Sequence, residues 1–133
     1  MRIGKVFMAF VLVVILSSAS LAKKESGVYL FGVSSSFSDT VVYFTEIQFL
    51  DTVKLDKGGI LPDMHNYSGQ LENYIQVMQD KSHQTAAIFY STKRGRLEKE
   101  RTKLYNRYKK KKNSTVEFLS ADDFTYVKAN KED

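Results

Sequence analysis

The chain has 133 residues, with 20 Lys and Arg against 15 Asp and Glu, a formal net charge of +5, one proline and no cysteine. This length predicts one domain with at most a short additional segment. The absence of cysteine excludes a disulfide-held scaffold, a thiolate-ligated zinc or iron–sulfur site and a thiol nucleophile.

The first 22 residues have the pattern of a secretory signal peptide. Arg2 and Lys5 precede an unbroken apolar run over 6–16, and mostly small residues follow over 17–22. We expect cleavage before Lys23 and export to the periplasm or the medium. The alternative is a membrane anchor, but the run of 11 apolar residues is shorter than the roughly 20 that a spanning helix needs. The mature chain, 23–133, has no transmembrane segment and is expected to form a single domain.

Two apolar segments near the start of the mature chain predict a β-hairpin. The segment 28–33 (VYLFGV) and the longer segment 40–50 (TVVYFTEIQFL) are both rich in aromatic and β-branched residues. The serine-rich turn 34–39 connects them. Alternate residues of one regular strand share a face. The longer strand is therefore expected to place these residues on one side: Val41, Tyr43, Thr45, Ile47 and Phe49.

The rest of the chain alternates between helical and strand patterns. Paired glycines and the only proline mark a loop over 56–66. Ser68 is the expected N-cap of a helix that reaches Met78, because apolar residues recur at helical spacing after it. The nearly continuous apolar segment 85–92 predicts a strand covered on both faces. A second helix over 93–112 follows, and then two short strands or one bent strand over 115–119 and 124–127.

The element order β-β-α-β-α-β indicates the α+β class. We expect a single small domain with a mixed, mainly antiparallel sheet and two helices mostly on one face.

The charge of the mature chain is concentrated on the second helix. Residues 93–112 contain eleven basic and two acidic side chains, a net charge of +9, whereas the rest of the mature chain has seven basic and thirteen acidic ones, −6. A helical projection places Leu97, Leu104, Tyr105 and Tyr108 in one sector, with Arg101 among them. The opposite sector is a basic ridge formed by Arg96, Lys99, Lys103, Arg107 and Lys110.

The start of this helix is a second basic feature. Lys93, Arg94 and Arg96 oppose the helix dipole, at a cost of about 0.3–1 kcal/mol each, and Gly95 leaves the backbone accessible to an anion. The candidate anion-binding residues are therefore Lys93, Arg94, Arg96, Lys99, Lys103, Arg107 and Lys110. The alternative is a surface helix whose Lys and Arg are only solvated.

The expected partners of this helix are anionic lipid, polysaccharide or an acidic protein. Export argues against nucleic acid, as does the lack of aromatic side chains for base stacking on the exposed face of this helix, since Tyr105 and Tyr108 are expected to point inward. The oligomeric state is not indicated, although a free sheet edge could pair with a partner chain.

No motif identifies a catalytic residue, a cofactor or a metal. Asp63 and His65, with His83 or Asp80, do not have the spacing of a zinc site. The alternative function is a small hydrolase that uses the serine-rich turn with His65 and Asp63, which would require these groups to converge.

Three segments carry a resemblance to a known group. The runs YLFGVSSSFSDTVVYFTEIQF, NYSGQLENYI and AAIFYSTKRG, followed by a basic helix, resemble small exported proteins of unknown function from Bacteroidota. The resemblance spans most of the mature chain. It implies a periplasmic or secreted location and no particular chemistry.

Overall fold

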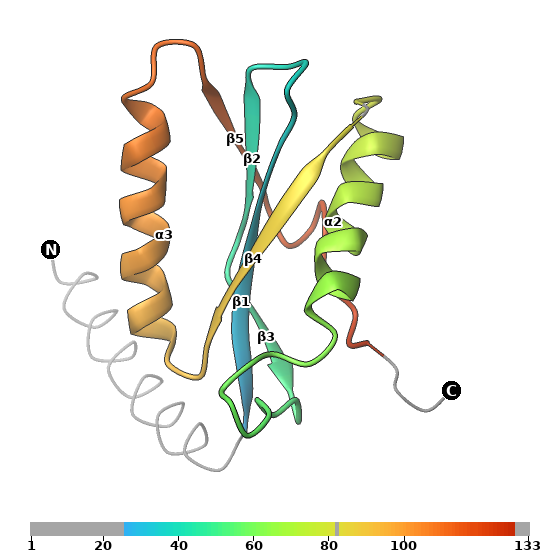
Figure 1. The fold of residues 1–133 in the computed structure, drawn as a ribbon, viewed down its shortest axis with the longest axis vertical. Coiled ribbons are helices and arrows are strands. Elements are labelled where there is room, and N and C mark those ends of the chain that lie inside the picture. Colours follow the sequence, from blue (N-terminus) through green and yellow to red (C-terminus); the bar gives the residue numbers. More distant parts are fainter. Residues whose placement is uncertain (1–25, 82, 130–133) are drawn as a thin grey trace, which may run out of the picture.

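Five strands and two helices make up the fold in the computed structural model, which describes residues 26–81 and 83–129 (Figure 1). The strands are β1 (Gly27–Ser35), β2 (Val41–Thr45), β3 (Gln48–Asp51), β4 (Thr85–Ser91) and β5 (Thr115–Leu119). The helices are α2 (Met64–Met78) and α3 (Arg94–Lys109). This arrangement confirms a single small α+β domain. The predicted signal peptide lies outside the described residues.

The central strand β1 organises the sheet. It pairs antiparallel with β4 along one edge and with β2 and β3 along the other, and β5 pairs parallel with β2. The sheet is therefore mixed and mainly antiparallel, as predicted. The predicted second strand forms as two pieces, so the observed order has one more strand before α2 than expected.

The break between β2 and β3 is a β-bulge. Two residues of β1 separate Leu30 from Val33, whereas three separate their partners Gln48 and Phe44. One extra residue in a strand reverses the faces of the side chains that follow it. Tyr43 accordingly packs on the α2 side, and Ile47 on the α3 side. The prediction of one face for the whole segment is wrong, because it assumed an unbroken strand.

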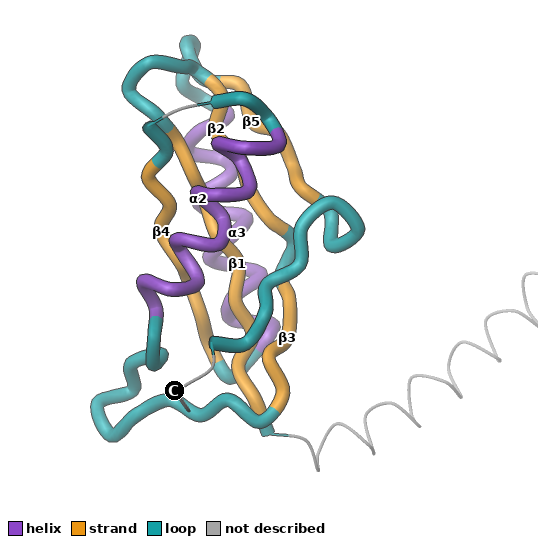
Figure 2. The backbone as a smooth tube through the Cα atoms, turned by 90° about the vertical axis from the view of Figure 1, so that its right-hand side faces the viewer, coloured by secondary structure: helices purple, strands orange, loops and turns teal. Residues whose placement is uncertain are grey.

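The helices cover opposite faces of the sheet. In Figure 1 the strands lie between α2 and α3, and in Figure 2 α3 lies behind the strands and α2 in front. The α2 side is formed by Val28, Leu30, Tyr43, Leu50, Tyr67, Leu71 and Ile75, and the α3 side by Phe31, Val33, Val42, Phe44 and Leu97. The expectation of both helices mostly on one face is wrong. Neighbours in β1 such as Leu30 and Phe31 are both fully buried, which requires a cover on each side.

Helix α2 begins four residues before the predicted N-cap, Ser68. Asp63 occupies the cap position in a left-handed conformation, and the Ser68 hydroxyl donates to the His65 carbonyl inside the helix. The loop that was expected to reach residue 66 is therefore shorter than predicted.

The segment after β5 follows the edge of β3 without forming a strand. The Gln48 side chain donates to the Phe124 carbonyl (2.9 Å) and accepts from the Tyr126 amide (2.8 Å). The side chain of Gln70 in α2 likewise donates to the carbonyl of Val127 and accepts from its amide. Side-chain amides thus bond the backbone that was predicted to form a strand, while Phe124 and Tyr126 contribute their rings to the core.

The serine-rich turn is joined to the end of the α2 region by an ion pair. Lys81 Nζ lies 2.8 Å from an Asp39 carboxylate oxygen, and this contact lowers the pKa of Asp39 below its usual range. A depressed carboxyl pKa means that the ion pair stabilises the folded chain above the pKa of unfolded Asp, and that this contribution is lost as the pH falls through the folded pKa.

Lys81→Gln is therefore expected to raise the pKa of Asp39, as measured by an NMR titration of its side-chain carboxyl carbon. The pair is partly exposed, so 1 M salt should produce a shift in the same direction. Lys57→Gln is the control and should leave the Asp39 titration unchanged. An equal shift in both variants would show that net charge, and not this contact, sets the Asp39 pKa.

Candidate anion-binding surface

One face of helix α3 packs on the sheet, and the residues of the basic ridge lie on its other sides. Leu97 is fully buried, and Leu104, Tyr105 and Tyr108 pack around the same cluster as Phe31 and Phe44. The predicted apolar sector of the helix is thus the face that docks. Lys93 is the N-cap residue and Lys110 the C-cap residue, so the regular helix is shorter than predicted at its C-terminal end.

All seven candidate anion-binding residues are exposed to solvent. Lys93 and Arg94 lie at the start of α3, and the basic ridge runs along its outer face to Lys110. Within residues 26–81 and 83–129, the salt bridges are Lys81–Asp39, Arg94–Glu98 and Lys128–Asp51. The basic ridge therefore has no carboxylate partner in the described part of the chain.

The two ends of α3 differ electrostatically. The first turn has no acidic residue, and the last turn contains Arg107 and Lys109, which the helix dipole favours. The predicted anion pocket had three cations, Lys93, Arg94 and Arg96, but Arg94 is engaged elsewhere. Its Nε lies 2.9 Å from a Glu98 carboxylate oxygen, and its guanidinium lies 5.9 Å from the Tyr29 ring centre. The predicted anion pocket at the helix start thus retains only two of its cations, Lys93 and Arg96.

Arg101 lies on the opposite side of α3 from the basic ridge and is half-buried. Its guanidinium carbon lies 5.3 Å from the ring centre of Phe118 and 5.8–5.9 Å from those of Phe44 and Phe31. Its Nε donates to the carbonyl of Thr45 (3.0 Å), the last residue of β2 before the bulge. Burial lowers the pKa of Arg101, and the nearby charge of Glu46 partly opposes this shift.

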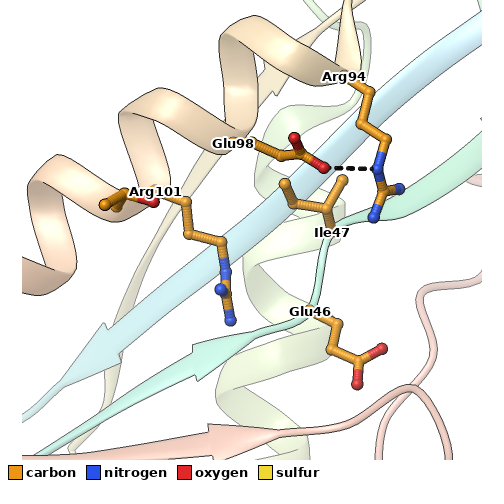
Figure 3. A pocket seen from close by; sticks show the side chains of 6 residues that line it. Glu46, Ile47, Arg94, Glu98 and Arg101 are labelled. Atoms are coloured by element: carbon orange, nitrogen blue, oxygen red, sulfur yellow. Dashed lines mark hydrogen bonds and ion pairs between the residues drawn. The ribbon is translucent and has the colours of Figure 1, made fainter.

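A hollow of about 380 Å³ opens between α3 and the bulge (Figure 3). It is lined by Glu46, Ile47, Arg94, Glu98, Arg101 and Thr102. In Figure 3 the Arg94–Glu98 pair lies at one end, and the side chains of Arg101 and Glu46 lie at the other. These four charges sum to zero, so the hollow is neutral as a whole but has separated positive and negative groups.

The sequence alone did not identify this hollow, although it contained one signal. Arg101 is the one charged residue that the helical projection placed among Leu97, Leu104, Tyr105 and Tyr108. A charged group in the docking sector must meet a partner on the sheet, and here that partner is a strand carbonyl exposed next to the bulge.

The groups of the hydrolase hypothesis lie apart. His65 is the second residue of α2, and the first turn of this helix lies at the other end of the sheet from the serine-rich turn (Figure 1). The turn instead shares a hollow of about 400 Å³ with His83, through Phe37 and Ser38. Asp63 lines a different hollow with Tyr67 and Lys128. Among residues 26–81 and 83–129, no group of three or more His, Asp or Glu side chains could hold a metal ion.

Comparisons of this chain with protein-family models, with curated proteins and with solved structures found no match. Among the described residues, no helix has the length and apolar character needed to cross a membrane.

Proposed function

We propose that this chain is an exported, non-catalytic binding protein that attaches to an anionic component of the cell envelope through the basic ridge of α3. The observation that carries this proposal is that the ridge has no carboxylate partner within residues 26–81 and 83–129. Its five cations are all exposed on one side of a helix whose other side packs on the sheet. An anionic lipid headgroup layer, an acidic polysaccharide or an acidic protein face would supply the missing charge.

The spacing of the ridge residues opposes the stability of α3, although the helix dipole favours Arg107 in the last turn. Lys99, Lys103 and Arg107 follow one another at intervals of four residues, and like charges at this spacing destabilise a helix by about 0.2–0.5 kcal/mol per pair. The cations at the helix start oppose its dipole as well. A bound anion would offset both effects, so binding is expected to stabilise the folded chain.

The shape of the ridge favours an extended polyanion or a charged surface. The 14 residue steps from Arg96 to Lys110 correspond to a line of charge about 21 Å long, at 1.5 Å per step. The apolar face of α3 is already buried against the sheet, so this helix has no free apolar face to insert between lipid chains. Binding should therefore be electrostatic and strongly dependent on salt.

Lys99→Glu with Lys103→Glu is expected to weaken binding to vesicles that contain phosphatidylglycerol, or to an acidic polysaccharide, by at least about tenfold at low salt. This follows from about 1 kcal/mol for each Lys near an anionic surface. Binding can be measured by cosedimentation with vesicles and by calorimetry with the polysaccharide. Neutral phosphatidylcholine vesicles should bind neither form.

The matched control is Lys54→Glu with Lys57→Glu, because these exposed lysines lie in the loop before α2 and give the same change of −4 in net charge. This variant should bind nearly as well as the unmodified chain. Equal losses in both variants would assign the effect to net charge, and affinity that ignores both the ridge variant and salt would overturn the proposal.

A further inference from the structure

The guanidinium of Arg101 is held in position by its contacts, but in the described part of the chain only one of its nitrogens, Nε, forms a hydrogen bond with the protein. Its Nε donates to the Thr45 carbonyl, and its plane lies near the rings of Phe31, Phe44 and Phe118. Within residues 26–81 and 83–129, its terminal nitrogens have no hydrogen-bond acceptor and no carboxylate within 4.0 Å. Those nitrogens are accessible to solvent. Among the described residues, the side-chain polar atom that is both fully buried and unpaired is Nε2 of Gln84, and neither terminal nitrogen of Arg101 is in this state. Arg101 therefore presents a fork of N–H donors to the hollow.

Such a fork suits a carboxylate. A guanidinium binds a planar carboxylate through two parallel hydrogen bonds, and a guanidinium that is already held by packing loses little freedom when it does so. The hollow of about 380 Å³ lies within the size range of small-molecule sites. A carboxylate carried by a small molecule would thus find a donor pair that the protein itself leaves open.

The second charged group at this end of the hollow restricts the ligand further. Glu46 is exposed and acts electrostatically on Arg101, yet it forms no salt bridge with it. Glu98 at the far end is neutralised by Arg94. A simple anion would be attracted by Arg101 and repelled by Glu46. A molecule with a carboxylate and an adjacent ammonium group would pair with Arg101 and Glu46, respectively. Its own net charge of zero suits a hollow whose charged side chains also sum to zero.

We propose that the hollow between α3 and the β2–β3 bulge binds a small α-amino-acid-like zwitterion, with its carboxylate on Arg101 and its ammonium group on Glu46. Ile47 lines the same hollow, beside the Arg94–Glu98 pair in Figure 3, and offers a small apolar contact to the side chain of the ligand. This site uses the side of α3 opposite to the basic ridge, so it is independent of the proposed envelope contact.

Three probes separate the charges of such a ligand: L-alanine, propionate, which lacks the ammonium group, and ethylamine, which lacks the carboxylate. Each is titrated into isotope-labelled protein, and the NMR signals of the Glu46 and Ile47 amides and of the Arg101 Nε–H group are followed. We expect saturable shifts with L-alanine, binding about threefold to fivefold weaker with propionate, and none with ethylamine.

Two substitutions assign the contacts. Arg101→Lys keeps the charge but removes the fork, and it should weaken L-alanine and propionate binding at least tenfold. Glu46→Gln should remove the preference for L-alanine over propionate. Glu46 is exposed, so its substitution should leave the fold intact. The Glu46→Gln variant therefore tests the proposed site even if Arg101→Lys disturbs the core. The Lys99→Glu and Lys103→Glu variant should bind L-alanine normally, which separates this site from the ridge.

Three results would overturn the proposal. They are the absence of saturable shifts with L-alanine, undiminished binding in Arg101→Lys, and a preference for L-alanine that survives Glu46→Gln.

Discussion

Phe44→Ala is expected to lower the free energy of unfolding by about 3–5 kcal/mol, the range for truncation of a fully buried phenylalanine. Phe44 is fully buried in β2 and lies at the centre of the α3-side core. Its ring centre lies 6.0–6.4 Å from those of four other rings, which are Phe31, Tyr105, Tyr108 and Phe118. The cavity would open where β1, β2, β5 and α3 meet, so these elements cannot close it without losing contact with one another.

Phe37→Ala is the matched control, because Phe37 is fully exposed in the turn between β1 and β2. The same change of side chain should alter the free energy of unfolding by no more than about 0.5 kcal/mol. Both values come from chemical denaturation followed by circular dichroism. A loss below about 1 kcal/mol in Phe44→Ala would mean that α3 does not pack on this face of the sheet.

Phe44→Ala also removes one of the rings beside Arg101. At temperatures where the variant is still folded, it should bind L-alanine more weakly, because the guanidinium is held less firmly. Phe37→Ala should bind L-alanine as the unmodified chain does.

The elements that the sequence predicted well are those with a strong signal in their own residues. The helical spacing of Leu97, Leu104 and Tyr108 identified the docking face of α3, because that spacing reflects one continuous helix. The segments around β1 and β4 were predicted as strands from their aromatic, β-branched and apolar composition, which is also a local property. The α+β class followed from the order of these elements.

The errors arose where a tertiary contact decides the outcome. The β2–β3 bulge contains neither glycine nor proline, so no local signal marks it, and the extra residue is apparent only from the partners of β1. The opposite placement of the helices was missed although β1 carried a signal for it, since Leu30 and Phe31 are adjacent apolar residues of one strand. Phe124 and Tyr126 resemble strand residues, but the side chains of Gln48 and Gln70 bond the backbone here.

The two candidate sites differ in the same way: one depends on local sequence and the other on tertiary contacts. The ridge lies on a single helix, so its composition could be predicted from the sequence. The Arg101 hollow brings together residues 46 and 101, which are far apart in the chain, and it depends on the bulge that exposes the Thr45 carbonyl to Arg101. No spacing rule within the sequence relates these positions.

Gly32→Ala and Gly69→Ala make the same chemical change in two environments and should have effects of opposite sign. Gly32 is buried in β1, and a Cβ there would lie 2.7 Å from Leu71 Cδ2 and also against the Tyr126 hydroxyl. Leu71 and Tyr126 are themselves buried and cannot move away freely. We expect Gly32→Ala to lower the free energy of unfolding by about 1–3 kcal/mol, the usual cost of adding a methyl group to a packed core.

Gly69 lies inside α2, where a Cβ would meet no atom within 4 Å. Gly69→Ala should raise the free energy of unfolding by about 0.5–1 kcal/mol, because alanine is favoured over glycine in a helix interior. Replacing glycine also restricts the unfolded chain, by a similar amount in both variants. The difference between the two changes therefore isolates the folded state, and chemical denaturation of the pair measures it. If Gly32→Ala proved as stable as Gly69→Ala, then α2 and the segment around Tyr126 would not pack against β1 as closely as the structure requires.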